Sequence, residues 1–377
     1  MRGFGFGFSA VLIGIHLERQ GLAPAWIGVT LGIGLASASL MGLASVALAA
    51  RIGRRPVLAL IGLLMAVSGF DLAFSSAPAL LVVSGITGML GASGVDLGPF
   101  APLEQAALTE VTAEKLRNLA FGRYSLTGGI FNAAGGLAAT AASASNGRAF
   151  FVLYGLLGLL TGALPLFMSA RAESELRASL LAPLRDPTRV RLLGGLAALF
   201  ALDSLAGGFV ANAVIAYWLH VRFGASPALL GPFFAAVAIL QSVSYEISAR
   251  LSVRIGLINT MVFTHLPSNV LLLLVAFTPT VGWAIALLLA RFLLAQMDVP
   301  ARQAYVVSIV PASERASALA LTGAVRGVAQ AAGPPLAGLA IGAAAFGVPF
   351  FAGGGLKIVY DLSLFTGFRH RRAMHES

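Results

Sequence analysis

A series of long apolar segments is the feature that most constrains how this chain can fold. Crossing about 30 Å of hydrocarbon takes about 20 helical residues, and the chain has twelve apolar segments close to or above that length. They lie at roughly 3–18, 25–49, 56–75, 79–104, 118–144, 149–170, 192–219, 227–249, 257–277, 281–306, 316–343 and 347–368. The sequence therefore predicts an all-α polytopic membrane protein with twelve transmembrane helices.

Composition supports the same class. Of the 377 residues, 58% are hydrophobic and only 11% are charged, whereas a soluble domain has about 25% charged residues. The net charge of +10 does not indicate a nucleic-acid partner, because no basic face alternates with aromatic residues. The chain has no cysteine, which excludes disulfides and thiol chemistry.

The chain repeats itself. The basic hairpin Arg51-Ile52-Gly53 recurs 203 positions later as Arg254-Ile255-Gly256, again between apolar runs. The same offset aligns Gly5, Phe6, Ala10, Val11, Gly21 and Pro24 with Gly208, Phe209, Ala213, Val214, Gly224 and Pro227, and an offset of 198 aligns Pro102, Gln105, Arg117 and Gly129 with Pro300, Gln303, Arg315 and Gly327. A parallel internal repeat is typical of two-domain secondary transporters. We expect an N-terminal six-helix half over 1–170, a cytoplasmic linker over 171–191, and a C-terminal six-helix half with a short basic tail over 192–377.

The hairpin also carries a family resemblance. Arg51-Ile52-Gly53-Arg54-Arg55 resembles the loop signature of the major facilitator superfamily, G-x-L-A-D-R-x-G-R-R, with Val46 and Ala50 in place of its first Gly and its Asp. The resemblance implies a transporter that works by alternating access, with helices 1, 4, 7 and 10 around a central cavity. It also implies gating roles for Arg51, Gly53, Arg54 and Arg55 and for the repeat counterpart Arg254.

Ionisable side chains at membrane depth are costly and are functional candidates by default. Asp203 lies about eleven residues into helix 7, about 16 Å from its cytoplasmic end, and the repeat places Arg2 at a similar depth. The candidates for substrate or proton binding are Arg2, Asp96, Asp203, Asp298 and Arg326. The alternative for Arg2 and Asp203 is that they only neutralise each other across the two halves.

The spacing of charged residues suggests three pairs. Asp298 and Arg302 are four residues apart and share a helical face. Glu104 is the repeat counterpart of Arg302, so these two opposite charges could form a gate or a static brace. Lys357 and Asp361 are also four apart, and we expect them to form a structural pair on helix 12.

Enzyme chemistry has no support in the sequence. The five histidines show no metal-ligand spacing, and no P-loop is present, so we expect no enzymatic activity, cofactor or metal. The leading hypothesis is proton-coupled efflux of small organic or amphipathic compounds. One alternative is uptake or facilitated transport of an organic anion held by Arg2 and Arg326, and a more remote one is a non-transporting receptor or scaffold. The expected partners are a small-molecule substrate, the proton and the lipid bilayer, without nucleic acid, and the chain should act as a monomer.

The basic residues in the loops predict how the chain is oriented in the membrane. With the Arg51 hairpin in the cytoplasm, that side receives 16 basic residues and the other side receives three, so the positive-inside rule places both termini in the cytoplasm. We expect a bacterial inner (plasma) membrane location. Because the repeat partner of helix 1 begins about a dozen residues earlier, we also expect helix 1 to lack part of its cytoplasmic end; a short tilted helix is the alternative.

Overall fold

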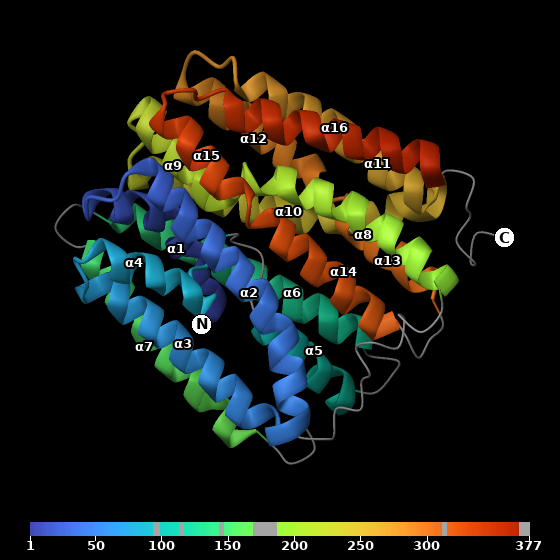
Figure 1. Cartoon of the computed structure of the whole chain (residues 1–377), viewed down its shortest axis with the longest axis horizontal. Helices are drawn as coiled ribbons and strands as arrows, with labels where there is room; N and C mark the ends of the chain where they lie inside the picture. The colour runs from blue at the N-terminus through green and yellow to red at the C-terminus, as the bar shows by residue number, and fades with distance from the viewer. Residues whose placement is uncertain (93–98, 113–116, 143–146, 169–186, 311–314, 369–377) are drawn as a thin grey trace. The chain divides into compact units, whose positions relative to one another are not determined.

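The computed structural model describes residues 1–92, 99–112, 117–142, 147–168, 187–310 and 315–368 (Figure 1), and all regular secondary structure in these ranges is helical. The first part of the chain forms α1 (Arg2–Arg19), α2 (Pro24–Ile52), α3 (Arg54–Phe74), α4 (Pro78–Ser84), α5 (Phe100–Val111), α6 (Arg117–Ala138) and α7 (Gly147–Ala163). Short 3-10 helices follow α4, α6 and α7 as η1 (Gly85–Thr87), η3 (Ala139–Ala141) and η4 (Leu164–Phe167).

The second part forms nine further helices in the described ranges. These are α8 (Pro187–Gly208), α9 (Asn212–Phe223), α10 (Pro227–Ile255), α11 (Leu257–Val275), α12 (Val281–Ala295), α13 (Asp298–Ser308), α14 (Arg315–Gln330), α15 (Gly333–Gly342) and α16 (Val348–Phe368). The predicted all-α polytopic class is confirmed, and the order of the helices agrees with the twelve-helix, two-half arrangement.

Several predicted spans are built from two helical pieces. Seven of the described helical segments are long and apolar enough to cross a membrane. Predicted span 10 is divided into α12 and α13, and span 11 into α14 and α15. The break in span 11 comes just before Gly333-Pro334-Pro335, and a proline near the start of a helix fits because its missing N–H would have had no helical acceptor there.

The helix bounds repeat at the offsets found in the sequence. α2 and α10 both have 29 residues, and their first residues, Pro24 and Pro227, are 203 positions apart. Each ends in a glycine with a positive φ, +91° at Gly53 and +85° at Gly256, and both have a ψ of 163°. This conformation is essentially restricted to glycine. The two basic hairpins therefore share a backbone geometry as well as a sequence.

The chain divides into two compact units. Unit 1 comprises Met1–Arg177, Ala211–Ala238 and Pro334–Ala344. Within it, α3 and α7 lie side by side (Figure 1). A Cβ atom added to Gly62 would lie 2.3 Å from the Cα of Gly162, so the two backbones approach as closely as glycine allows, as is common between helices in lipid.

Unit 1 also contains segments from late in the chain. α9 packs on α1, where Gly14 faces the ring of Tyr217. A Cβ on Gly28 of α2 would lie 2.3 Å from the carbonyl oxygen of Pro334, at the start of α15. Glu18 accepts a hydrogen bond from the hydroxyl of Tyr217 at 3.4 Å and lies 3.5 Å from Nε2 of His220. Small residues and one polar cluster thus join segments of both sequence halves.

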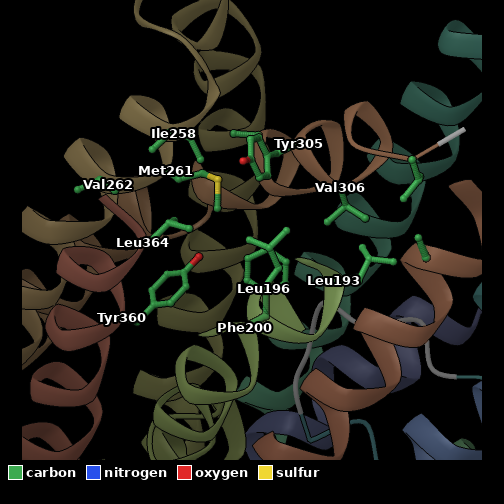
Figure 2. Close-up of a cluster of buried hydrophobic side chains, with 13 residues drawn as sticks. Leu193, Leu196, Phe200, Ile258, Met261, Val262, Tyr305, Val306, Tyr360 and Leu364 are labelled. Carbon is green, nitrogen blue, oxygen red and sulfur yellow. The ribbon is translucent and has the colours of Figure 1, made fainter. Parts of the chain in front are cut away.

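Unit 2 comprises Ala178–Val210, Ile239–Gly333 and Ala345–Ser377. Its apolar core is formed by side chains from α8, α11, α13, α14 and α16, and Figure 2 shows the centre of this cluster. Phe200, Met261, Tyr305 and Tyr360 are all at most 1% exposed. The same helices, together with α12, also carry the charged side chains that form the main candidate site.

Candidate functional site

Asp203 on α8 is the centre of a buried charge network in unit 2, and only 4% of it is exposed. Nζ of Lys357, on α16, donates to its Oδ1 at 2.5 Å and to its carbonyl oxygen at 3.3 Å. Nη1 of Arg302, on α13, lies 3.5 Å from Oδ2, and Nε2 of His265, on α11, lies 3.8 Å from Oδ1. One carboxylate therefore connects basic groups from three other helices.

His265 links this carboxylate to a second one. Its Nδ1 lies 2.9 Å from Oδ1 of Asp361, which is fully buried on α16. Nδ2 of Asn269, one turn along α11 from His265, donates to the other oxygen of Asp361 at 2.8 Å. The imidazole thus lies between two carboxylates, and imidazole is a side chain suited to carrying protons near neutral pH.

Arg302 links the network to a third carboxylate. Its Nη1 donates to Oδ2 of Asp298, one turn earlier on α13, at 2.6 Å. The predicted Asp298–Arg302 pair is confirmed. Arg302 also lies 5.6 Å from the centre of the Phe200 ring, and both members of the pair are 3% exposed, so solvent screens their interaction little.

Two more arginines add positive charge to the network. Arg291 on α12 and Arg326 on α14 are both within electrostatic reach of Asp203. Nε of each is buried without a hydrogen-bond partner in the described part of the chain, as is Nη1 of Arg291. Counted over the described residues of the network, the permanent cations Arg291, Arg302, Arg326 and Lys357 exceed the carboxylates Asp203, Asp298 and Asp361 by one.

Unit 1 has a simpler charged group. Arg2 of α1 donates from Nη1 and Nη2 to the two oxygens of Glu104 on α5, at 2.6 and 2.7 Å. Tyr124 of α6 donates to Glu104 at 2.7 Å, and the Arg2 guanidinium lies 4.3 Å from the centre of the Phe100 ring. This two-point contact is the strong form of an arginine–carboxylate pair.

The hairpin residues divide by exposure. Arg51 and Arg254 are exposed, whereas Arg54 is 1% exposed at the start of α3. Nη2 of Arg55 donates to the carbonyl oxygen of Met168 at 2.5 Å. In this structure Arg55 therefore ties the start of α3 to the end of predicted span 6.

Some sequence expectations do not match these contacts. The expected Lys357–Asp361 pair is wrong: both side chains face into unit 2, but Lys357 reaches α8 and Asp361 reaches α11. For Arg2 and Asp203 the alternative was that they neutralise each other, but in this structure each has a partner within its own unit. Asp96, most of the 171–191 linker and the basic tail lie outside the described residues.

His265, Asn269, Lys357 and Asp361 were not among the predicted site residues, although the histidine is a polar residue within an apolar segment. Their contacts between helices join positions 62 to 154 residues apart, which no local spacing rule reveals. In the described ranges, no group of three or more His, Asp or Glu side chains is arranged to hold a metal ion.

Comparisons with known proteins agree with this architecture. A sequence profile described as Major Facilitator Superfamily matches residues 1–295. An uncharacterized membrane protein of Saccharomyces cerevisiae is 22% identical over 408 residues, covering 97% of this chain and 91% of its own.

Solved structures with the same fold include three transporters. The nucleoside transporter NupG matches with a TM-score of 0.76 and 13% identity, covering 98% of this chain and 97% of its own. A D-xylose-proton symporter matches with a TM-score of 0.71 and 16% identity over 97% of this chain and 95% of its own. The human organic anion transporter MFSD10 matches with a TM-score of 0.62 and 17% identity over 96% of this chain and 97% of its own.

Proposed function

This chain belongs to the major facilitator superfamily of membrane transporters, and we propose that it exports small organic compounds in exchange for protons. The observation that supports coupling is the buried Asp203 network of unit 2. This buried carboxylate contacts basic groups on three other helices, so its protonation can change how these helices pack.

The coupling would work through the contacts of Asp203. Protonation removes its negative charge and so weakens its attraction for Lys357 and Arg302, which connect α8 to α16 and α13. The helices would then pack in one arrangement when Asp203 is ionised and in another when it is protonated. A solute that binds better to one arrangement changes the proton affinity of Asp203, and protonation changes the affinity for the solute by the same factor. His265, between Asp203 and Asp361, is in position to pass the proton within unit 2.

The chemical nature of the solute has two candidate answers. Aromatic side chains beside the network, Phe200 and Tyr360, favour a compound with an apolar body. The excess of cations in the network favours one that also carries a negative charge, the organic anion of the alternative hypothesis; MFSD10, which shares the fold, is described as an organic anion transporter.

The coupling role can be tested in proteoliposomes with an imposed pH gradient. Ethidium serves as a cationic probe and fluorescein as an anionic one. We expect Asp203→Asn to lose uphill transport while still exchanging probe across the membrane, with a flattened pH dependence. Arg250→Gln, which changes an exposed arginine paired with Glu246, should behave like the wild type. Uphill transport by Asp203→Asn with the normal pH dependence would contradict the proposal.

We also propose that the basic hairpins face the cytoplasm of a bacterial cell and that both termini lie inside. Val253, 87% exposed beside Arg254, and Thr280, exposed between α11 and α12, should lie on opposite sides of the membrane. Because the chain has no cysteine, single Val253→Cys and Thr280→Cys variants can be labelled selectively. An impermeant maleimide added outside intact cells should label only the second, and the reverse result would invert the topology.

Arg51, Gly53, Arg54, Arg55 and Arg254 are proposed to act in gating. Because Arg55 ties two helix ends of unit 1 together, its loss should change the interconversion of states more than solute binding. In the double variant Arg54→Ala, Arg55→Ala we expect slower transport with unchanged equilibrium binding of the probe. Equal loss of binding in a correctly folded variant would instead place these residues in the binding site.

Glu104 and Arg302, at repeat-related positions, are proposed as gating residues of the two halves. The double variant Glu104→Arg, Arg302→Glu reverses both charges. If the two positions interact during the transport cycle, this variant should retain more transport activity than either single variant. Additive losses, measured with the same probes, would assign each to its own unit alone.

A further inference from the structure

Arg291 lies at the depth where a transported solute is expected. It is the eleventh residue of α12, about 15 Å along the helix from Val281 at 1.5 Å per residue. In a hydrocarbon layer about 30 Å thick, that position is near the midplane. The side chain is only 5% exposed.

The guanidinium of Arg291 lacks a counterion in the described part of the chain. Nε and Nη1 are both buried without hydrogen-bond partners. The main-chain carbonyl of Arg291 accepts a hydrogen bond from Ser268, which anchors the backbone of α12 but does nothing for the side-chain charge. The neighbouring Phe292 ring, 4.9 Å from Cζ, provides only a weak cation–π contact.

The carboxylates of the network are already engaged by other groups. Asp203 is held by Lys357 and approached by Arg302. Asp298 pairs with Arg302, and Asp361 accepts from His265 and Asn269. Asp203 acts on Arg291 electrostatically but does not pair with it. Within the described network, Arg291 is therefore the buried cation with two guanidinium donors, Nε and Nη1, that have no acceptor.

We propose that Arg291 binds the carboxylate group of the transported compound, which would then be a small organic monoanion with an apolar body. The inference rests on the proposed function and specifies its substrate class. A buried charge without a partner is unfavourable, and in native proteins such a group calls for a specific explanation. The planar guanidinium matches a carboxylate in a two-point contact. The surplus of a single cation matches a singly charged anion and not a doubly charged phosphate.

The experiment compares probes of one shape and different charge. Benzoate, benzamide and benzylamine share a ring but are anionic, neutral and cationic; decanoate and inorganic phosphate vary the apolar body and the anion. Binding is measured as the shift in melting temperature of the full chain in detergent. We expect benzoate and decanoate, but not the other three probes, to stabilise the wild type. Arg291→Gln should lower the affinity for the stabilising carboxylate at least tenfold, and Arg291→Lys should retain part of that affinity. Arg250→Gln should bind the carboxylate like the wild type.

Several outcomes would overturn the assignment. These are no stabilisation of the wild type by either carboxylate at 10 mM, equal stabilisation by benzamide or benzylamine, stronger stabilisation by phosphate, or unchanged carboxylate affinity in Arg291→Gln. If Arg291→Gln does not fold, the charge preference of the wild type and the partial affinity of Arg291→Lys still decide the result. Because the measurement uses no proton gradient, a failure here is distinct from a failure of Asp203 to couple transport to protons.

Discussion

The two units carry charged pairs at related positions, but with the signs exchanged. In unit 1 a cation on predicted span 1, Arg2, pairs with an anion on span 4, Glu104. In unit 2 an anion on span 7, Asp203, lies 3.5 Å from a cation on span 10, Arg302. Glu104 and Arg302 are repeat counterparts, 198 positions apart. The repeat has thus kept the connection between two helices and reversed its polarity.

The surroundings of the two pairs differ more than the pairs themselves. The unit 1 pair is complete, with one base and one acid in two-point contact, and Glu104 is 29% exposed. The unit 2 pair belongs to a larger network that is almost fully buried and has more cations than carboxylates. A complete pair suits a brace or a gate, whereas a buried network with surplus charge suits binding and coupling.

The largest expected effect comes from breaking the unit 2 network at Lys357. Lys357→Met leaves the Asp203 carboxylate buried with only longer contacts to Arg302 and His265, so we expect a loss of about 3 kcal/mol in the free energy of unfolding. The double variant Asp203→Asn, Lys357→Met should recover part of that loss, because it removes both charges. Unfolding in mixed detergent micelles measures both values, and a double variant less stable than Lys357→Met would contradict the explanation.

A smaller effect is expected in unit 1. Glu104→Gln replaces a two-point charged contact with a neutral one, but solvent reaches Glu104, so we expect a loss of about 1–2 kcal/mol. Tyr124→Phe, which removes one hydrogen bond to Glu104, is the matched control and should cost less. If Glu104→Gln destabilises the protein more than Lys357→Met, the contrast between the two units fails.

The hairpin glycines should behave alike in the two halves. Alanine at Gly53 or Gly256 would have to adopt a φ near +90° with an extended ψ, which costs about 1–3 kcal/mol, so we expect comparable decreases in melting temperature. Gly42→Ala is the control, because Gly42 is within α2 and a Cβ there meets no atom within 4 Å. That variant should be neutral or stabilising by up to about 1 kcal/mol. Unequal effects at Gly53 and Gly256 would show that the two turns do not carry the same strain.

The smallest effect should come from the exposed pair on α10. Arg250 and Glu246 are 78% and 66% exposed, and one turn separates them. We expect Arg250→Gln to change the free energy of unfolding by less than about 0.5 kcal/mol. A larger loss would show that exposure is a poor guide to the strength of ion pairs in this protein.

The sequence could predict what depends on local spacing and on the repeat. The length of the apolar segments predicts the helices, and the 203-residue offset predicts the matching bounds of α2 and α10. The four-residue separation of Asp298 and Arg302 predicts their ion pair. The depth of Asp203 follows from counting residues along its helix. These are properties of single helices or of the repeat.

Contacts between distant helices could not be predicted in this way. The four-residue rule also suggested Lys357–Asp361, but each of these side chains finds a closer partner on a neighbouring helix. Which helices adjoin α16, and how it is rotated, depends on the packing of the whole unit. For the same reason Arg291 was not among the predicted site residues, and only the three-dimensional contacts showed that two of its donors lack an acceptor in the described part of the chain.

The surplus positive charge of the Asp203 network has an electrical consequence. When Arg291 holds a monoanion, the network is neutral, and a membrane voltage exerts little force on the loaded site. When the site is empty, it carries about one positive charge, and moving that charge through the whole field changes the energy by about 2.3 kcal/mol per 100 mV. The voltage-dependent step of the cycle would then be the return of the carrier without its organic anion.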